Sequence, residues 1–130
     1  MTGARPVDPV VGLIRALLEH LRGASEGWQS LAMVLEFDGD GLRSTHGFAY
    51  GPWDVVSAVS ARPAGIVVAV DTYTTATYGP DDAPPIKLLV QFDRTQGAYR
   101  IQFEDSDAAR WSVTPATVDQ VRTELRPHFE

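Results

Sequence analysis

Hydrophobic side chains recur every three or four positions near the start of the chain, which predicts an amphipathic helix over residues 8–22. Asp8 can cap its first turn, Pro9 suits the first helical position, and Gly23 is a natural stop. The apolar stripe consists of Val10, Leu13, Ile14, Leu17, Leu18 and Leu21. We expect this helix to pack on a sheet, because its polar side carries both charges, which argues against an anchor on a membrane surface.

Strands are predicted in the next part of the chain. Residues 28–37 are apolar on both alternating faces, as in a strand that is covered on both sides. Residues 42–50 are expected to return antiparallel after the turn signal at residues 38–41. The valines that follow Gly51-Pro52 favour a third strand over residues 54–60.

Residues 64–78 allow two interpretations. The run is rich in β-branched side chains, so propensity slightly favours a strand. Ile66, Val70, Tyr73 and Thr77 also lie on one face of a helix, so the period allows a helix as well. The prolines and aspartates of residues 79–85 indicate a loop after this segment.

The clearest alternation lies in residues 86–93 and 98–104, which predict a β-hairpin. One face is apolar and is expected to be buried: Ile86, Leu88, Val90, Phe92, Tyr99, Ile101 and Phe103. The other face is mainly polar and is expected to stay open to solvent or a partner: Lys87, Gln91, Arg100, Gln102 and Glu104. A last helix is predicted over residues 115–126, between a Thr-Pro start signal and Pro127.

Length and composition narrow the classes of function. A chain of 130 residues fits one domain, and a net charge of -6 makes free nucleic acid a poor partner, because phosphate binding rests on clustered cations. No stretch approaches the roughly 20 apolar residues that span a bilayer, and the start lacks the apolar core of a signal peptide. We therefore expect a cytoplasmic protein without a membrane partner.

Motifs for catalysis or for cofactors are missing from the sequence. With no cysteine, disulfides and thiolate zinc sites are excluded, and the three histidines fall on separate predicted elements. Asp38-Gly39-Asp40 is only a fragment of a calcium-binding loop. No cofactor or metal is expected, and no catalytic residue can be assigned.

The C-terminal third carries a family resemblance. Phe103-Glu-Asp-Ser-Asp-Ala-Ala-Arg-Trp111-Ser-Val-Thr-Pro, followed by Arg122-Thr-Glu-Leu-Arg-Pro127, resembles the C-terminal part of YezG-like bacterial immunity proteins. The segment from Gly97 to Asp105 stands where that family has a Gly-x-Phe/Tyr strand and an aromatic-acidic pair. The chain departs from the family pattern at Glu104 and at its Pro-Pro pair, residues 84–85.

The resemblance implies an α+β fold with an N-terminal helix, an antiparallel sheet with an inserted helix at residues 64–78, and a C-terminal helix. It implies a protein without enzymatic activity that binds and neutralises a cognate secreted toxin, often a nuclease. Acids at turns and strand ends would match a cationic toxin site, although water also favours acids at such places. The candidate partner-binding residues are Asp38, Asp40, Trp53, Lys87, Arg100, Glu104, Asp105 and Asp107.

The tryptophans receive different expectations. Trp53 follows Gly51-Pro52 and is expected to be exposed. Trp28 is expected in the core, and Trp111 is expected to fasten the last helix to the hairpin, with Arg110 bridging to Asp105 or Asp107.

Two other functions stay open on the residues alone. One is a small ligand-binding or enzymatic α+β domain, which requires a closed pocket with convergent polar groups. The other is a structural or oligomerisation module. The sequence does not indicate the toxin, its chemistry, the contact residues or the oligomeric state.

Overall fold

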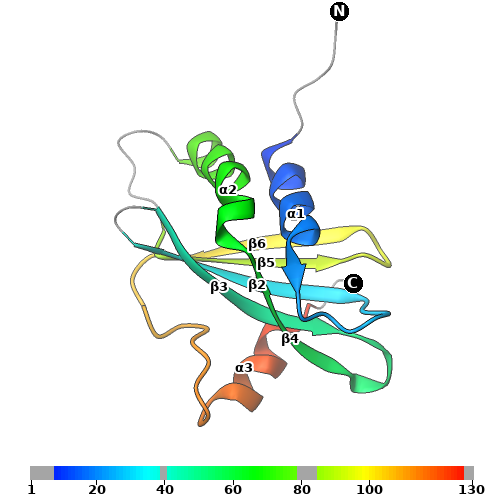
Figure 1. Cartoon of the computed structure of the whole chain (residues 1–130). Coiled ribbons are helices and arrows are strands. Elements are labelled where there is room, and N and C mark those ends of the chain that lie inside the picture. Colours follow the sequence, from blue (N-terminus) through cyan, green and yellow to red (C-terminus); the bar gives the residue numbers. More distant parts are fainter. Residues whose placement is uncertain (1–7, 39–40, 79–84, 128–130) are drawn as a thin grey trace, which may run out of the picture.

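The computed structural model describes residues 8–38, 41–78 and 85–127. Within them, an antiparallel sheet of six strands has two helices on one face and a third helix, with the irregular segment before it, on the other face (Figure 1). The predicted α+β class, with a helix inserted in the sheet and a closing helix, is confirmed.

The helices and strands follow in the order α1-β1-β2-β3-η1-β4-α2-β5-β6-α3. The helices are α1 (Pro9–Glu19), α2 (Pro63–Thr77) and α3 (Val118–Leu125), and η1 is a 3₁₀ turn at Pro52–Asp54. The strands are β1 (Leu21–Arg22), β2 (Ser30–Asp38), β3 (Gly41–Tyr50), β4 (Val56–Ala61), β5 (Lys87–Asp93) and β6 (Ala98–Glu104). In space the strands lie in the order β1-β4-β3-β2-β5-β6, so β6 is an edge strand.

Helix α1 is shorter than predicted, because its last predicted turn is used as a strand. Asp8 caps the helix as expected, with its carboxylate accepting from the Val10 N–H at 2.9 Å. The helix ends at Glu19, and Leu21–Arg22 then pair with the end of β4. Gly23 is the next residue, with a φ of 94°, and a Cβ there would lie 2.4 Å from the Ala58 carbonyl oxygen. The glycine thus permits a close approach to β4 rather than ending a helix.

The segment that propensity favoured as a strand is helical. Helix α2 covers Pro63–Thr77, as the family resemblance implied. Ile66, Val70 and Tyr73 are buried at helical spacing, so packing on the sheet outweighs the β-branched composition. Helix α3 starts three residues later than predicted, because residues 114–117 form a turn in which the Val118 N–H bonds to the Thr114 carbonyl at 2.9 Å.

The two faces of the sheet carry separate apolar clusters. Helices α1 and α2 cover one face, where the largest fully buried side chains include Leu13, Leu17, Met33 and Leu88. Trp28 is only half-buried at the margin of this cluster, and the Arg94 guanidinium lies 4.0 Å from the centre of its ring.

The second cluster lies under the C-terminal segment. It contains Ala32, Val34, Phe48, Tyr50, Leu89, Trp111, Val121 and Leu125. The polar hairpin face that was expected to remain open is therefore partly covered, and Lys87 and Gln91 are buried.

The apolar hairpin face departs from expectation in the opposite sense. Leu88 and Val90 on β5 are buried, but Tyr99 and Phe103 on the edge strand β6 are 45% and 57% exposed. Ile101 between them is half-buried. The prediction that all seven apolar side chains are buried holds for Leu88 and Val90 only, since Ile86 and Phe92 are half-buried as well. It fails most clearly on β6, because the two helices do not cover this edge.

Candidate functional site

The C-terminal segment, residues 105–127, is attached to the sheet by side chains that bond to its backbone carbonyl groups. Four donors rise from β3 and β5: His46, Tyr50, Lys87 and Gln91. They reach the carbonyl oxygens of Trp111, Arg122, Arg110 and Leu125, respectively. An irregular chain carries backbone groups that its own turns do not satisfy, and the sheet supplies donors for them.

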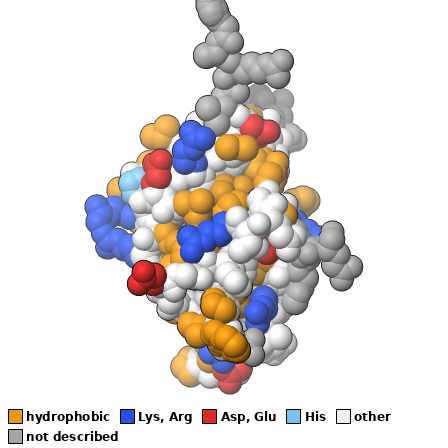
Figure 2. All heavy atoms as spheres, turned by 90° about the vertical axis from the view of Figure 1, so that its right-hand side faces the viewer, with side chains coloured by type: hydrophobic (Ala, Val, Ile, Leu, Met, Phe, Trp, Pro, Cys, Tyr) orange, Lys and Arg blue, Asp and Glu red, His pale blue; other side chains and the backbone are white. Residues whose placement is uncertain are grey.

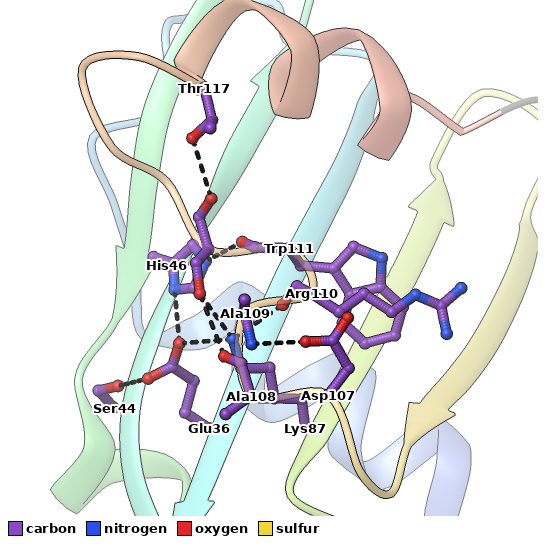
Figure 3. Close-up of polar contacts among 11 residues, drawn as sticks. Glu36, Ser44, His46, Lys87, Asp107, Ala108, Ala109, Arg110, Trp111 and Thr117 are labelled. Atoms are coloured by element: carbon purple, nitrogen blue, oxygen red, sulfur yellow. Dashed lines mark hydrogen bonds and ion pairs between the residues drawn. The ribbon is translucent and has the colours of Figure 1, made fainter.

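Lys87 is a charged residue among these donors, and it is buried. Its Nζ donates to the Arg110 carbonyl at 2.8 Å and to the Ser112 hydroxyl at 2.9 Å, and it lies 3.4 Å from Glu36 Oε1 (Figure 3). The residue is 4% exposed, so the expectation that it stands on an open face is wrong. A charge this deep requires a partner and hydrogen bonds, and here both are present.

Glu36 links Lys87 to strand β3. Its carboxylate accepts from the Ser44 hydroxyl at 3.1 Å, and its Oε1 lies 3.9 Å from His46 Nδ1 (Figure 3). Burial opposes ionisation of this carboxyl, but the Ser44 hydroxyl and the Lys87 ammonium outweigh it and lower its pKa. His46 Nε2 donates to the Trp111 carbonyl at 2.9 Å, which orients the ring between the carboxylate and the segment.

This cluster does not have the arrangement of a catalytic Ser–Lys pair. Such a pair needs a neutral amine to take the serine proton. Here Lys87 Nζ donates to the Arg110 carbonyl and to the Ser112 hydroxyl and lies 3.4 Å from the Glu36 carboxylate, so the serine oxygen is an acceptor for the lysine and not its proton donor. The contacts suit a clamp for the segment.

Two further donors hold helix α3. The Gln91 amide donates to the Leu125 carbonyl at 2.9 Å, and the Tyr50 hydroxyl donates to the Arg122 carbonyl at 2.6 Å. Both carbonyls belong to the last turn of α3, where no intrahelical partner exists. Burial raises the pKa of Tyr50, which keeps its hydroxyl protonated as a donor.

Two of the candidate acids, Glu104 and Asp107, accept hydrogen bonds from the loop that follows β6. Glu104 accepts from the backbone N–H of Ser106 and from the Arg110 guanidinium, which hold its pKa at about 2. Asp107 accepts from the Ala109 N–H at 2.9 Å. Arg110 thus pairs with Glu104, at 2.9 Å, and not with the expected Asp105 or Asp107. Its guanidinium also lies 4.4 Å from the centre of the Trp111 ring.

Trp53 and Trp111 share an uncommon backbone conformation, with φ at 63° in both. Trp111 is 4% exposed in the second cluster, as its expected fastening role requires. Trp53 lies in η1 and is 94% exposed, so its predicted exposure is confirmed. The neighbouring Pro52 is exposed too, and Val55 is 46% exposed, which makes the turn an apolar projection.

The candidate residues lie in separate regions. The register places Glu36, Lys87 and Glu104 in one row across the sheet, and the exposed Asp38 and Asp105 lie at that end. Trp53 lies near the opposite end of the sheet. It closely follows Tyr50, which shares a row across the strands with Ser30, Asp93 and Ala98. Arg100 is exposed in the middle of β6, and Asp40 lies outside the described residues.

Hollows among the described residues open to solvent. A groove of about 360 Å³ is lined mainly by apolar side chains of α1 and the β5–β6 hairpin, including Ile14, Leu18, Phe92 and Tyr99. Within the described ranges no three His, Cys, Asp or Glu side chains gather as a metal site needs. None of the described helices is both long enough and apolar enough to cross a membrane.

Searches for similar proteins found no family model that matches this chain and no match among curated proteins.

Proposed function

We propose that this chain is a binding protein without enzymatic activity, which neutralises a secreted bacterial toxin by occluding it. The observation that carries the proposal is the β3–β4 turn, where Trp53 is 94% exposed in a left-handed conformation. Such a conformation costs on the order of 1–3 kcal/mol in a residue other than glycine, and it concentrates at functional sites. Tryptophan is also enriched among residues that dominate binding energy.

The surroundings of Trp53 support a protein partner more than a small ligand. Pro52 and Val55 extend the apolar surface outward, so the turn forms a projection that can enter a pocket on another protein. Figure 2 shows hydrophobic side chains gathered in the lower part of the face on which this turn lies.

The nature of the partner rests on the resemblance to YezG-like immunity proteins. It is supported by the net charge of -6 and by the exposed Asp38 and Asp105, which favour approach of a cationic toxin such as a nuclease. Neutralisation in the producing cell requires a cytoplasmic protein, and we include that location in the proposal.

The test is a titration of the toxin domain encoded beside this gene, together with rescue of cells that express the toxin. The wild-type chain is expected to bind and to rescue. Trp53→Ala should weaken binding by about 30-fold or more, the effect of losing a residue worth at least 2 kcal/mol. Val68→Ala, a 76% exposed residue on α2, is the matched control and should bind normally.

A second variant separates the apolar turn from the acidic end. Asp105→Lys should slow association and reduce its dependence on salt, because exposed charges act mainly on the rate of encounter. Failure of the wild-type chain both to bind and to rescue would overturn the proposed function.

A further inference from the structure

The two edges of the sheet are protected to different degrees. At one edge, β1 pairs with the end of β4, and the loop after it contacts the rest of β4, where the Ser25 N–H bonds to the Ser57 hydroxyl at 3.1 Å. At the other edge, β6 pairs with β5 over seven residues without a shift in register. Strand β6 contains no proline and no lysine, which are common means of blocking an edge.

An exposed apolar row runs along the β6 edge. Tyr99, Ile101 and Phe103 lie opposite Phe92, Val90 and Leu88 of β5, so they point to the face that α1 and α2 cover. Tyr99 also lines the groove beside α1. A contiguous exposed apolar surface at a sheet edge is typical of an interaction site.

We infer that β6 pairs antiparallel with β6 of a second copy of this chain, about a two-fold axis at Ile101, which joins the two sheets into one. In this register Tyr99 lies opposite Phe103 of the second copy, and Phe103 lies opposite its Tyr99. Ile101 meets its own counterpart. Every exposed apolar side chain of the row thereby gains an apolar neighbour across the new pair of strands.

The polar side of the strand agrees with the same register. Arg100 lies opposite Gln102 of the second copy, so no two like charges are directly opposed. A register centred on Arg100 would oppose two guanidinium groups. A register centred on Gln102 would place Tyr99 opposite Asp105, which leaves an aromatic ring without an apolar neighbour.

This interface is independent of the proposed toxin contact. The Trp53 turn follows strand β3, and strands β2 and β5 lie between β3 and β6 in the sheet order. A dimer formed through β6 would therefore present two Trp53 turns.

The first test is sedimentation equilibrium of the full chain over a concentration series. The mass is expected to rise towards twice that of one chain. Phe103→Lys should raise the dissociation constant of the dimer by about tenfold or more, because the change removes both aromatic pairs and adds a charge to the edge. Val68→Lys on α2 is the control and should dimerise like the wild type, and circular dichroism of each variant checks that it is folded.

The second test reads the register through single cysteines, since the chain has none of its own. Ile101→Cys should form a disulfide between two copies under mild oxidation. Tyr99→Cys should not, because the two positions are four residues apart along the strands, about 13 Å at roughly 3.3 Å per residue. A monomer at every concentration, or equal cross-linking at both positions, would overturn the inference. So would a Phe103→Lys variant that weakens only toxin binding, since the edge would then serve the toxin.

Discussion

The β3–β4 turn and the C-terminal segment each place a tryptophan at a φ of 63°, and the surroundings of the two side chains are opposite. Trp111 is buried with Leu89, Val121 and Leu125, and its carbonyl accepts from His46. Trp53 is 94% exposed. At Trp111, burial of the ring and the hydrogen bond from His46 offset the free-energy cost of the strained backbone. At Trp53 the side chain adds no comparable burial, which points to a use outside the chain.

The C-terminal segment also differs from the helices on the other face of the sheet. Helices α1 and α2 satisfy their interior backbone groups themselves, so an apolar stripe suffices to hold them. The segment around Trp111 is irregular, and it needs donors such as Lys87 and His46 from the sheet. The irregular C-terminal segment is therefore held on the sheet by hydrogen bonds to its backbone as well as by the apolar contacts of the second cluster.

The largest expected effect is at Trp111. Trp111→Ala should lower the free energy of unfolding by about 3–4 kcal/mol, because it removes a buried ring and leaves a cavity beside Leu125. Urea denaturation measures the loss. Trp53→Ala is the matched change and should stay within about 0.5 kcal/mol of the wild type. Equal losses for the two variants would contradict the comparison.

Lys87 should have the next largest effect. Lys87→Met removes the donor to the Arg110 carbonyl and leaves Glu36 without its ammonium, at a cost of about 2–3 kcal/mol in unfolding free energy. Hydrogen exchange should accelerate in residues 106–118 before it does in α1. Arg43→Met, at an exposed position of β3, serves as the control and should change neither quantity. Uniform acceleration over the whole chain would mean that Lys87 does not act on the segment in particular.

Tyr50 offers a smaller and cleaner change. Tyr50→Phe keeps the buried ring and removes only the bond to the Arg122 carbonyl, so a loss of about 1 kcal/mol is expected in thermal or urea unfolding. Tyr99→Phe deletes a hydroxyl from a residue that is 45% exposed and should have little effect. The idea that sheet donors hold α3 fails if the two variants are equally stable.

Acid should act on the loop through Glu104. Its folded-state pKa of about 2 lies below the ordinary value of 4.5, so its contribution to stability is complete above about pH 4.5 and is lost as the pH falls towards 2. Glu104→Gln should flatten this part of the dependence of the melting temperature on pH. Glu124→Gln, an exposed change on α3, should leave the dependence as in the wild type. Identical curves for all three proteins would refute the role of Glu104.

Much of the fold can be predicted from local patterns. The start of α1 at Asp8-Pro9, the β2–β3 hairpin and the β5–β6 hairpin all follow from spacing and turn residues. The helix α2 could not be assigned from propensity, because its valines and threonines favour a strand locally and only packing against the sheet selects the helix. The end of α1 was missed because the pairing of Leu21 with Ala61 is a tertiary contact.

The candidate site was less predictable. Trp53 was identified from the Gly-Pro break before it, but Lys87 was assigned to an open surface because alternation cannot reveal a cover that is 23 residues away in sequence. The donor roles of His46, Tyr50 and Gln91 were missed for the same reason. The sequence offered one signal for these roles: a C-terminal stretch with little helix leaves backbone carbonyl groups that need hydrogen-bond donors from elsewhere in the fold.

The central claim is that the strain at Trp53 serves a partner and contributes nothing to the fold. Trp53→Gly tests it directly, because glycine adopts a positive φ without penalty and removes the exposed ring. The measurement is a calorimetric titration of the neighbouring toxin domain against the variant, with its unfolding free energy determined alongside. We predict binding that is weaker by about 30-fold or more in a variant that is as stable as the wild type, or more stable by up to about 1 kcal/mol. Unchanged toxin binding, or a variant that is less stable than the wild type, would contradict the claim.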